Sequence, residues 1–320
     1  MLATDTMTVV TRPGDAKTRI SRPRGGRSSV GRAAQTRAAW VLLLPFLAVF
    51  LLLTALPVIA SFSMSMTDIS VRELRDPLSV NFVGLDNFIK VASNPAFQKA
   101  ALTTGLFVIL CVPATIAMGF VLALLLNGVI RRLRNQYRAA AYLPVIANIV
   151  AAAVIWQYAF APSGLVNGGL ESLGIDGPNW LGDPQWAITT VVMLGVWRNI
   201  GTAMILFLAG LQAIPTDVYE AADIDGASTT RKVFSITLPL LRPTMLLITV
   251  LNTVAFLNIF EEPYLLTAGG PLSSTRSIAL WVYEQFGFGN IAASMSASFM
   301  LLLLVGIVAT VQFRVLRPKH

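Results

Sequence analysis

The sequence predicts an all-α membrane protein with six transmembrane helices and a short helical segment between the fourth and the fifth. Three observations predict this class. The chain has 320 residues, of which 55% are hydrophobic and only 12% charged, too few to cover a soluble domain of this length. It contains six apolar stretches long enough to cross a bilayer. Its basic residues gather beside one set of span ends, as in inner-membrane proteins.

The six apolar stretches each approach or exceed the roughly 20 residues of helix that a bilayer core requires. They are Ala39–Met64, Ala100–Asn127, Ala139–Phe160, Ala187–Leu211, Met245–Leu266 and Ile291–Phe313. Helices are expected because unpaired strand edges are too costly in lipid. The membrane domain is therefore predicted to cover residues 39–316, and residues 317–320 to form a short cytoplasmic tail.

Residues 1–38 precede the first span and combine eight basic residues with Gly, Ser and Pro. This composition predicts a disordered, basic cytoplasmic tail. A cleaved signal peptide is disfavoured because the first apolar stretch is too long, and no small-residue cleavage site follows a short apolar core.

The distribution of basic residues predicts the orientation in the membrane. If the N-terminus is cytoplasmic, the cytoplasmic segments hold 18 of the 24 Lys and Arg residues and the outer loops hold five. Short cytoplasmic loops are enriched in Lys and Arg, so both termini are predicted to be cytoplasmic. The same clustering argues against nucleic acid as a partner, which the net charge of +8 alone would suggest. The partner of most of the surface is expected to be membrane lipid.

The chain offers little for catalysis or metal binding. Cys111 is the only cysteine and lies inside an apolar stretch, and the only histidine is the last residue, His320. The pattern G-x-x-x-x-G-K-[ST], which holds nucleotide phosphates, does not occur. We therefore predict no catalytic residue, no metal site and no cofactor bound by this chain, so any ATP must be hydrolysed on another chain.

The connection between the fourth and fifth spans differs from the other connections. Thr216 is expected to cap a short helix that carries Glu220, and Ser228 to cap a second helix. Gly226 lies between the two, where the chain must turn. From these residues alone, two interpretations stay open: a solvated linker, or a rigid helix pair that transmits movement from a cytosolic partner.

Three kinds of side chain in this connection suit a docking surface. Small residues leave room for close approach, acidic residues can pair with a basic groove, and apolar residues can be buried by a partner. The small residues are Ala221, Ala222 and Ala227. The acidic residues are Glu220, Asp223 and Asp225, and the apolar residues are Val218 and Phe234.

A longer pattern in the same connection carries a resemblance to a known family. It consists of Glu220-Ala221-Ala222, Asp225-Gly226-Ala227, Phe234, Ile236, Leu238-Pro239 and Pro243. This pattern resembles the EAA motif of binding-protein-dependent ABC importer permeases. The resemblance implies that the segment is a coupling helix that docks into a cleft on an ATPase subunit. It also implies three partners: a cytoplasmic ATPase dimer that binds ATP and Mg, a second homologous permease subunit, and an extracytoplasmic solute-binding protein.

Other segments resemble the carbohydrate branch of that family, the maltose and glycerol-phosphate permeases. They are residues 82–88, Leu143-Pro144, Glu262-Pro263-Tyr264 and residues 267–271. Thr103 and Ala268 depart from the branch, which often has Asn and Gly there. The resemblance covers residues 39–316 and implies a permease subunit in the inner membrane that forms half of the path for a sugar or related solute.

Polar side chains at membrane depth are candidates for the solute path, because they are costly in lipid unless they face protein or water. The candidates are Asn148, Trp156, Gln157, Arg198, Asn252, Asn258 and Glu261. Amides and aromatic rings suit a sugar, which is rich in hydroxyl groups and has apolar ring faces. The competing interpretation is that these side chains form hydrogen bonds between helices. Glu261 and Glu262 are expected near the outer face, exposed to solvent.

The main alternative function is a secondary transporter driven by an ion gradient. Such proteins often contain two similar halves and ionisable residues at mid-membrane. This chain shows no obvious repeat, and its most specific motif is cytoplasmic and occurs once. The solute stays open between sugars, polyols and glycerol phosphates. The scarcity of basic residues at membrane depth argues against a phosphate ester, with Arg198 as the exception.

Overall fold

The computed structural model describes residues 29–71, 73, 80–129 and 134–316. Within these ranges the regular structure is helical, and the only bridge between extended residues joins Thr67 to Phe82. The chain divides into two compact units, Met1–Pro57 and Val58–His320.

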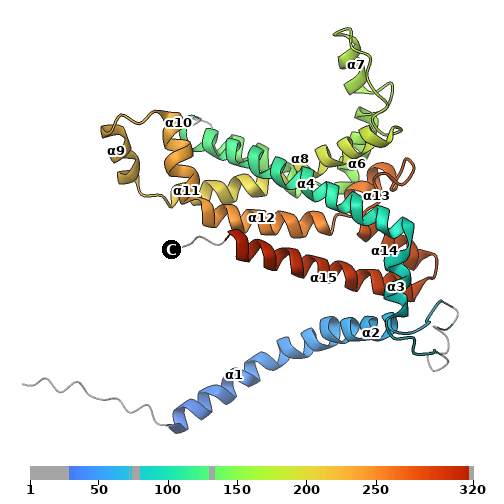
Figure 1. Cartoon of the computed structure of the whole chain (residues 1–320). Coiled ribbons are helices and arrows are strands. Elements are labelled where there is room, and N and C mark those ends of the chain that lie inside the picture. Colours follow the sequence, from blue (N-terminus) through green and yellow to red (C-terminus); the bar gives the residue numbers. More distant parts are fainter. Residues whose placement is uncertain (1–28, 72, 74–79, 130–133, 317–320) are drawn as a thin grey trace, which may run out of the picture. The chain divides into compact units, whose positions relative to one another are not determined.

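The first unit contains the helix α1 (Ser29–Phe50) and the π-helical segment η1 (Leu51–Ala55), which continue into α2 (Leu56–Ser65) (Figure 1). The apolar part of this helix, Ala39–Ser65, is long enough to cross a membrane and matches the first predicted span. Of the predicted N-terminal tail, residues 1–28 lie outside the described residues, and α1 already begins at Ser29.

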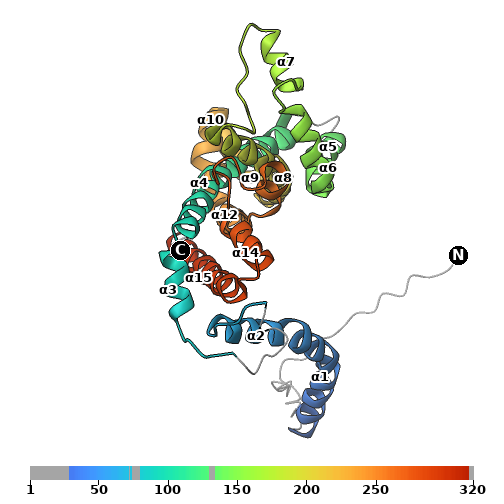
Figure 2. The ribbon, with the colours of Figure 1, turned by 90° about the vertical axis from the view of Figure 1, so that its right-hand side faces the viewer.

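The second unit is built on four long helices: α4 (Pro95–Leu124), α8 (Pro184–Gln212), α12 (Arg242–Leu257) and α15 (Ile291–Leu316). The helix α4 packs against α8 and α12, and α12 packs against α15, as both views of the ribbon show (Figures 1 and 2). Phe107 of α4, Leu194 of α8 and Phe256 of α12 meet in the largest buried apolar cluster. Burial of the apolar faces of α4, α8 and α12, rather than helix propensity, stabilises the packing of these helices.

Local sequence explains where α4 and α8 begin. The side chain of Asn94 accepts hydrogen bonds from the backbone N–H groups of Ala96 and Phe97, and Pro95 is the first helical residue. Asp183 and Pro184 play the same two parts for α8. A side-chain oxygen at the cap satisfies otherwise unpaired N–H groups, and proline in the first turn loses no helical hydrogen bond.

Shorter elements connect the long helices. They are η3 (Leu125–Val129), α3 (Asp86–Ser93), α5 (Arg134–Ile146), α6 (Ile149–Ala159), α7 (Leu165–Glu171), α9 (Thr216–Ile224), α10 (Thr229–Lys232), η4 (Val233–Thr237), α11 (Leu238–Leu240), α13 (Glu261–Thr267) and α14 (Ile278–Gly287). Figure 1 shows α9 and α10 near one end of α4 and α8, and α13 and α14 near the other.

The described residues contain four helices that are long and apolar enough to cross a membrane. They are Ala39–Ser65, Pro95–Gly128, Pro184–Gln212 and Ile291–Val315. Two bent pairs also qualify: Asn135–Ile146 with Ile149–Ala159, bent by 96°, and Thr229–Leu240 with Arg242–Leu257, bent by 68°. By length and composition, the described part of the chain thus offers four such helices, or up to six spans if each bent pair is one.

The third and fifth predicted spans differ from the simple helices that the sequence suggested. The third breaks at residues 147–148, where Asn148 takes an extended conformation and starts α6. The fifth ends at Leu257, and α13 starts at Glu261. Pro263 lies in the first turn of α13, where a proline costs no helical hydrogen bond.

Two glycines permit close approach between helices. A Cβ atom added to Gly119 of α4 would lie 2.7 Å from the Cβ of Ala203 in α8. A Cβ atom added to Gly201 of α8 would lie 2.5 Å from the carbonyl oxygen of Ala141 in α5. Both distances are too short for real atoms, so α8 can sit this close to α4 and α5 only because these residues have no side chain.

Candidate functional site

The connection between α8 and α12 folds into two short helices, α9 and α10, as the sequence predicted. The helix α9 begins at Thr216, but the cap position is held by Pro215, without a side-chain hydrogen bond. The expectation that Thr216 caps this helix is therefore wrong; its hydroxyl faces the carboxylate of Asp217 instead. Ser228 does cap α10, accepting a hydrogen bond from the Arg231 N–H at 3.3 Å.

The turn between the two helices is made by Gly226, whose φ is +69°. The N–H of Gly226 donates to the Asp223 carbonyl at 3.1 Å, and the N–H of Ala227 donates to the Ala222 carbonyl at 2.9 Å. This hydrogen-bonding pattern ends a helix by a left-handed residue, which is most often glycine. The turn predicted at Gly226 is present.

The exposed surface of α9 combines charged, small and apolar side chains. Glu220, Ala221 and Asp225 are exposed, and Ala227 is half-buried. Ala222 was expected to leave room for a partner, but its side chain is buried within this chain. The small side chain of Ala222 instead allows α9 to pack closely against neighbouring residues of this chain.

Two large apolar side chains stand out from this surface. Ile224 is 88% exposed and Phe234 is 63% exposed. Phe234 was predicted as an apolar anchor, whereas Ile224 was missed. Its signal in the sequence was an isolated isoleucine between the two acidic residues Asp223 and Asp225.

Side-chain contacts hold α9 against the segment that follows it. The hydroxyl groups of Tyr219 and Thr237 lie 3.0 Å apart, and Lys232 forms an ion pair with Asp223. Thr237 belongs to η4, which continues through α11 into α12. These contacts connect α9 to the segment that leads into α12.

A cavity of about 340 Å³ lies beside the far end of α12. It is lined by residues of α5, α8, α12, α13 and the break between the last two. These residues are Val145, Arg198, Asn199, Ala255, Phe256, Asn258, Ile259, Phe260, Glu261 and Glu262. The lining thus combines amide, charged and aromatic residues, the mixture expected for binding a polar solute.

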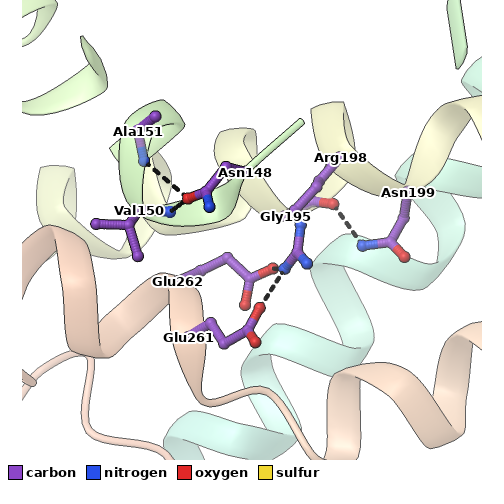
Figure 3. A network of polar contacts seen from close by, with 8 residues as sticks. All are labelled: Asn148, Val150, Ala151, Gly195, Arg198, Asn199, Glu261 and Glu262. Atoms are coloured by element: carbon purple, nitrogen blue, oxygen red, sulfur yellow. Dashed lines mark hydrogen bonds and ion pairs between the residues drawn. The ribbon is translucent and has the colours of Figure 1, made fainter. Parts of the chain in front are cut away.

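Arg198 of α8 reaches across the cavity to two carboxylates of α13 (Figure 3). Its Nη1 atom lies 2.7 Å from Oε2 of Glu261 and 3.0 Å from Oε1 of Glu262. The side chain of Glu262 is only 7% exposed, whereas that of Glu261 is 49% exposed. The expectation that both glutamates are solvated is therefore wrong for Glu262, whose charge is buried against the guanidinium.

Three of the seven predicted path residues line this cavity: Arg198, Asn258 and Glu261. The side-chain amide of Asn258 donates to the Val254 carbonyl at 2.8 Å. Asn199 also lines the cavity but was not among the candidates, although it directly follows Arg198 in the sequence. Its amide donates to the Gly195 carbonyl at 2.9 Å (Figure 3).

The other four candidates do not line the cavity, and their contacts are within the protein. Asn148 caps α6: its Oδ1 accepts from the N–H groups of Val150 and Ala151 (Figure 3). The amide of Gln157 donates to the Leu265 carbonyl at 2.7 Å, joining α6 to α13. Asn252 is buried and donates to a carbonyl of its own helix.

Trp156, the remaining candidate, is half-buried among aromatic rings. Its ring stacks on Phe160 with centroids 5.0 Å apart and lies 5.8 Å from that of Trp197. Among the residues that the structure describes, no group of three or more His, Cys, Asp or Glu side chains is arranged to hold a metal ion.

Known proteins with similar sequences are permeases. The chain is 30% identical over 299 residues to the lactose transport system permease protein LacF of Rhizobium radiobacter, covering 92% of this chain and 98% of that protein. It is 35% identical over 272 residues to the trehalose/maltose transport system permease protein MalF of Thermococcus litoralis, covering 85% and 90%. It is 36% identical over 258 residues to the sn-glycerol-3-phosphate transport system permease protein UgpA of Pectobacterium atrosepticum, covering 78% and 85%.

The fold also occurs in a solved transporter. A chain of a bacterial alginate ABC transporter, determined in complex with an alginate pentasaccharide-bound periplasmic protein, matches this structure with a TM-score of 0.77. The match covers 89% of this chain and 96% of that one, at 23% sequence identity. It supports the helical permease fold.

A family profile covers most of the chain. Residues 115–320 match the binding-protein-dependent transport system inner membrane component. This match includes α9, Gly226 and every residue that lines the cavity. Together with the relatives, it favours the importer permease over the ion-gradient-driven transporter. The chain belongs to the family of binding-protein-dependent transport system inner membrane components.

Proposed function

We propose that this chain forms half of the translocation path of an ATP-driven importer for a sugar or a related solute. The named substrates of its relatives support this solute class: lactose for one and trehalose or maltose for another. In this proposal an extracytoplasmic binding protein delivers the solute, and a second homologous permease subunit completes the path.

The observation that carries the proposal is the position and surface of α9. Glu220, Ala221 and Ile224 are exposed on a short helix that projects from the group of long helices (Figure 1). An exposed isoleucine beside a carboxylate suits a groove with apolar walls and a basic rim. A cytoplasmic ATPase dimer that binds ATP and Mg²⁺ provides that groove in our proposal.

The route from α9 to the cavity is continuous. Movement of α9 reaches η4 through the Tyr219–Thr237 contact and passes through α11 to α12. Asn258 directly follows the far end of α12 and lines the cavity, as does Glu261. Packed helices transmit such displacements because their interiors are dense and hardly compressible. ATP-driven closure of the partner would thus change the shape of the solute cavity.

Substitutions at Gly226 test this proposal in the complete complex, reconstituted with its ATPase, second permease and binding protein. At a φ of +69°, valine is strained by on the order of 1–2 kcal/mol. Asparagine adopts such angles more readily. No heavy atom of the described residues lies within 4 Å of an added Cβ, so within this chain asparagine has room.

We expect Gly226→Val to abolish solute uptake or release the ATPase. Gly226→Asn should keep the turn but add a side chain on the surface that faces the ATPase. A loss of uptake or of ATPase co-purification in this variant would therefore indicate that the ATPase packs closely against residue 226. Gly174 is the matched control, because its φ is +74° and an added Cβ also meets no neighbour. Gly174→Val should transport normally. Wild-type uptake and ATPase co-purification in both Gly226 variants would contradict the docking role.

A second measurement concerns ATP hydrolysis. We expect the purified subunit alone to hydrolyse no ATP, because the sequence lacks a phosphate-binding loop. Hydrolysis that persists in the isolated chain and follows its concentration would contradict the assignment of the nucleotide to a partner.

A further inference from the structure

The cavity beside α13 has an unbalanced charge. Of the described residues that line it, three are ionisable: Arg198, Glu261 and Glu262. One guanidinium faces two carboxylates, so the formal charge of this cluster is −1. Both carboxylates approach the same atom, Nη1 of Arg198. The single cation in the lining is therefore already engaged by two anionic partners.

The two glutamates differ in what they offer to a solute. Glu262 is buried against Arg198, and an anion that approached Nη1 of the guanidinium would meet both carboxylates. Glu261 is half exposed and presents its carboxylate to the cavity. An anionic solute would meet a like charge at close range, while a hydroxyl group would meet a strong hydrogen-bond acceptor.

The rest of the lining suits an uncharged, hydroxyl-rich solute. Two polar residues, Asn199 and Asn258, also line the cavity. Phe260 also lines it, and its ring stacks on that of Tyr264, with centroids 5.2 Å apart and the rings inclined by only 12°. A stacked ring that is fixed in orientation can support the apolar face of a sugar ring.

We propose that this subunit selects uncharged saccharides and excludes sugar acids and phosphate esters, through the charge of the Arg198–Glu261–Glu262 cluster. This inference rests on the proposed import function and names its substrate class. Family membership alone does not decide it, because one relative is named for lactose and another for sn-glycerol-3-phosphate. Arg198, taken by itself, would favour a phosphate; its pairing with two carboxylates reverses that expectation.

The local charge can be measured without knowing the natural solute. A single cysteine replaces Ala255, an exposed residue of the lining, in a Cys111→Ala background. The complex, held in lipid nanodiscs, is treated with methanethiosulfonate reagents that carry either a trimethylammonium or a sulfonate group. The ratio of the two reaction rates, divided by the ratio for a free thiol, reports the electrostatic potential. Leu165→Cys, exposed on α7, is the reference position.

We expect the cationic reagent to be favoured at position 255 by about tenfold relative to position 165. Adding Glu261→Gln, which brings the formal charge of the cluster to zero, should remove most of that preference. A ratio equal to the reference, a preference for the sulfonate, or no change with Glu261→Gln would overturn the inference. Failure of both reagents to react would also overturn it, because the cavity would then not be open to water.

The uptake assay separates this inference from the proposed function. ATP-dependent import of an uncharged saccharide by the reconstituted complex supports both. Efficient import of a sugar acid or a sugar phosphate would overturn the charge selection and leave the import function intact. Absence of any ATP-dependent import would count against the function itself, whatever the reagent ratio.

Discussion

Arg198 lies in a helix of mostly apolar residues, and its contacts explain how a charge is accommodated there. The guanidinium is held between Glu261, which is half exposed, and Glu262, which is buried. These contacts join α8 to α13 across the cavity. Removing one partner of a buried ion pair leaves the other charge without compensation, which costs more than the pair contributes. The three residues therefore have unequal effects on stability.

We predict that Arg198→Met lowers the thermal unfolding midpoint of the purified protein, with a loss of about 3 kcal/mol, because Glu262 is left buried and unpaired. Glu261→Gln should cost less than about 1 kcal/mol, since its side chain is half exposed. The double variant Arg198→Met/Glu262→Gln should recover part of the loss. Equal midpoints for Arg198→Met and Glu261→Gln would contradict the buried-pair explanation.

Helix packing in the second unit depends on the positions of glycine residues. The helix α8 contacts α4 through Gly119 and α5 through its own Gly201. Not every glycine on these helices has this role: an added Cβ at Gly105 of α4 would meet no heavy atom within 4 Å. Close approach of helix backbones through small residues is a general device of membrane proteins.

We predict that Gly119→Val reduces the yield of folded, monodisperse protein, because the added side chain overlaps Ala203 and overpacking costs about 1–3 kcal/mol. Gly105→Val is the matched control on the same helix and should express like the wild type. Size-exclusion chromatography in detergent makes the comparison. Comparable profiles for the two variants would show that α4 and α8 do not need this contact.

Within the second unit, the two functional features lie toward opposite ends of the long helices. The α9–α10 pair is at one end and the cavity is near α13 at the other (Figure 1). The helix α12 connects them, starting after α11 and ending at the cavity. If both termini are cytoplasmic, as the basic residues predict, α9 faces the cytoplasm and α13 the outside.

Cysteine labelling in whole cells tests this orientation. In a Cys111→Ala background, Ile224→Cys of α9 should resist a membrane-impermeant maleimide, and Leu272→Cys after α13 should react. Both side chains are more than four-fifths exposed, so a difference between them reflects the membrane and not burial in this chain. Disruption of the membrane in cells that lack the ATPase subunit should make Ile224→Cys reactive, because no docked partner then covers it. Labelling of both positions from outside would overturn the topology.

Local features could be predicted from the sequence. Continuous apolar stretches give four of the long helices, because the length and composition of a span are properties of the segment itself. The turn at Gly226 could be predicted for the same reason, since a left-handed conformation is a local preference of glycine. The resemblance in the connection between spans four and five likewise needed only contiguous residues, and the family match over residues 115–320 confirmed it.

Two boundaries were missed although their signals were local. Asn148 caps α6 and so breaks the third stretch, and Pro263 in the first turn of α13 marks the break in the fifth. Hydropathy alone hides both signals, because the residues around them are apolar enough to count as one span. A cap residue or a proline can be recognised as a helix boundary only when backbone hydrogen bonds are considered together with hydropathy.

The tertiary structure decided which side chains meet. Arg198 and Glu262 are 64 residues apart in the sequence, and they pair only because α13 folds back against α8. Burial of Ala222 and exposure of Ile224, two residues apart on one short helix, depend on which neighbours α9 packs against. The sequence by itself thus determined four of the long apolar helices, the turn and the family. The cavity and its charge depended on contacts between distant segments, which no pattern of contiguous residues encodes.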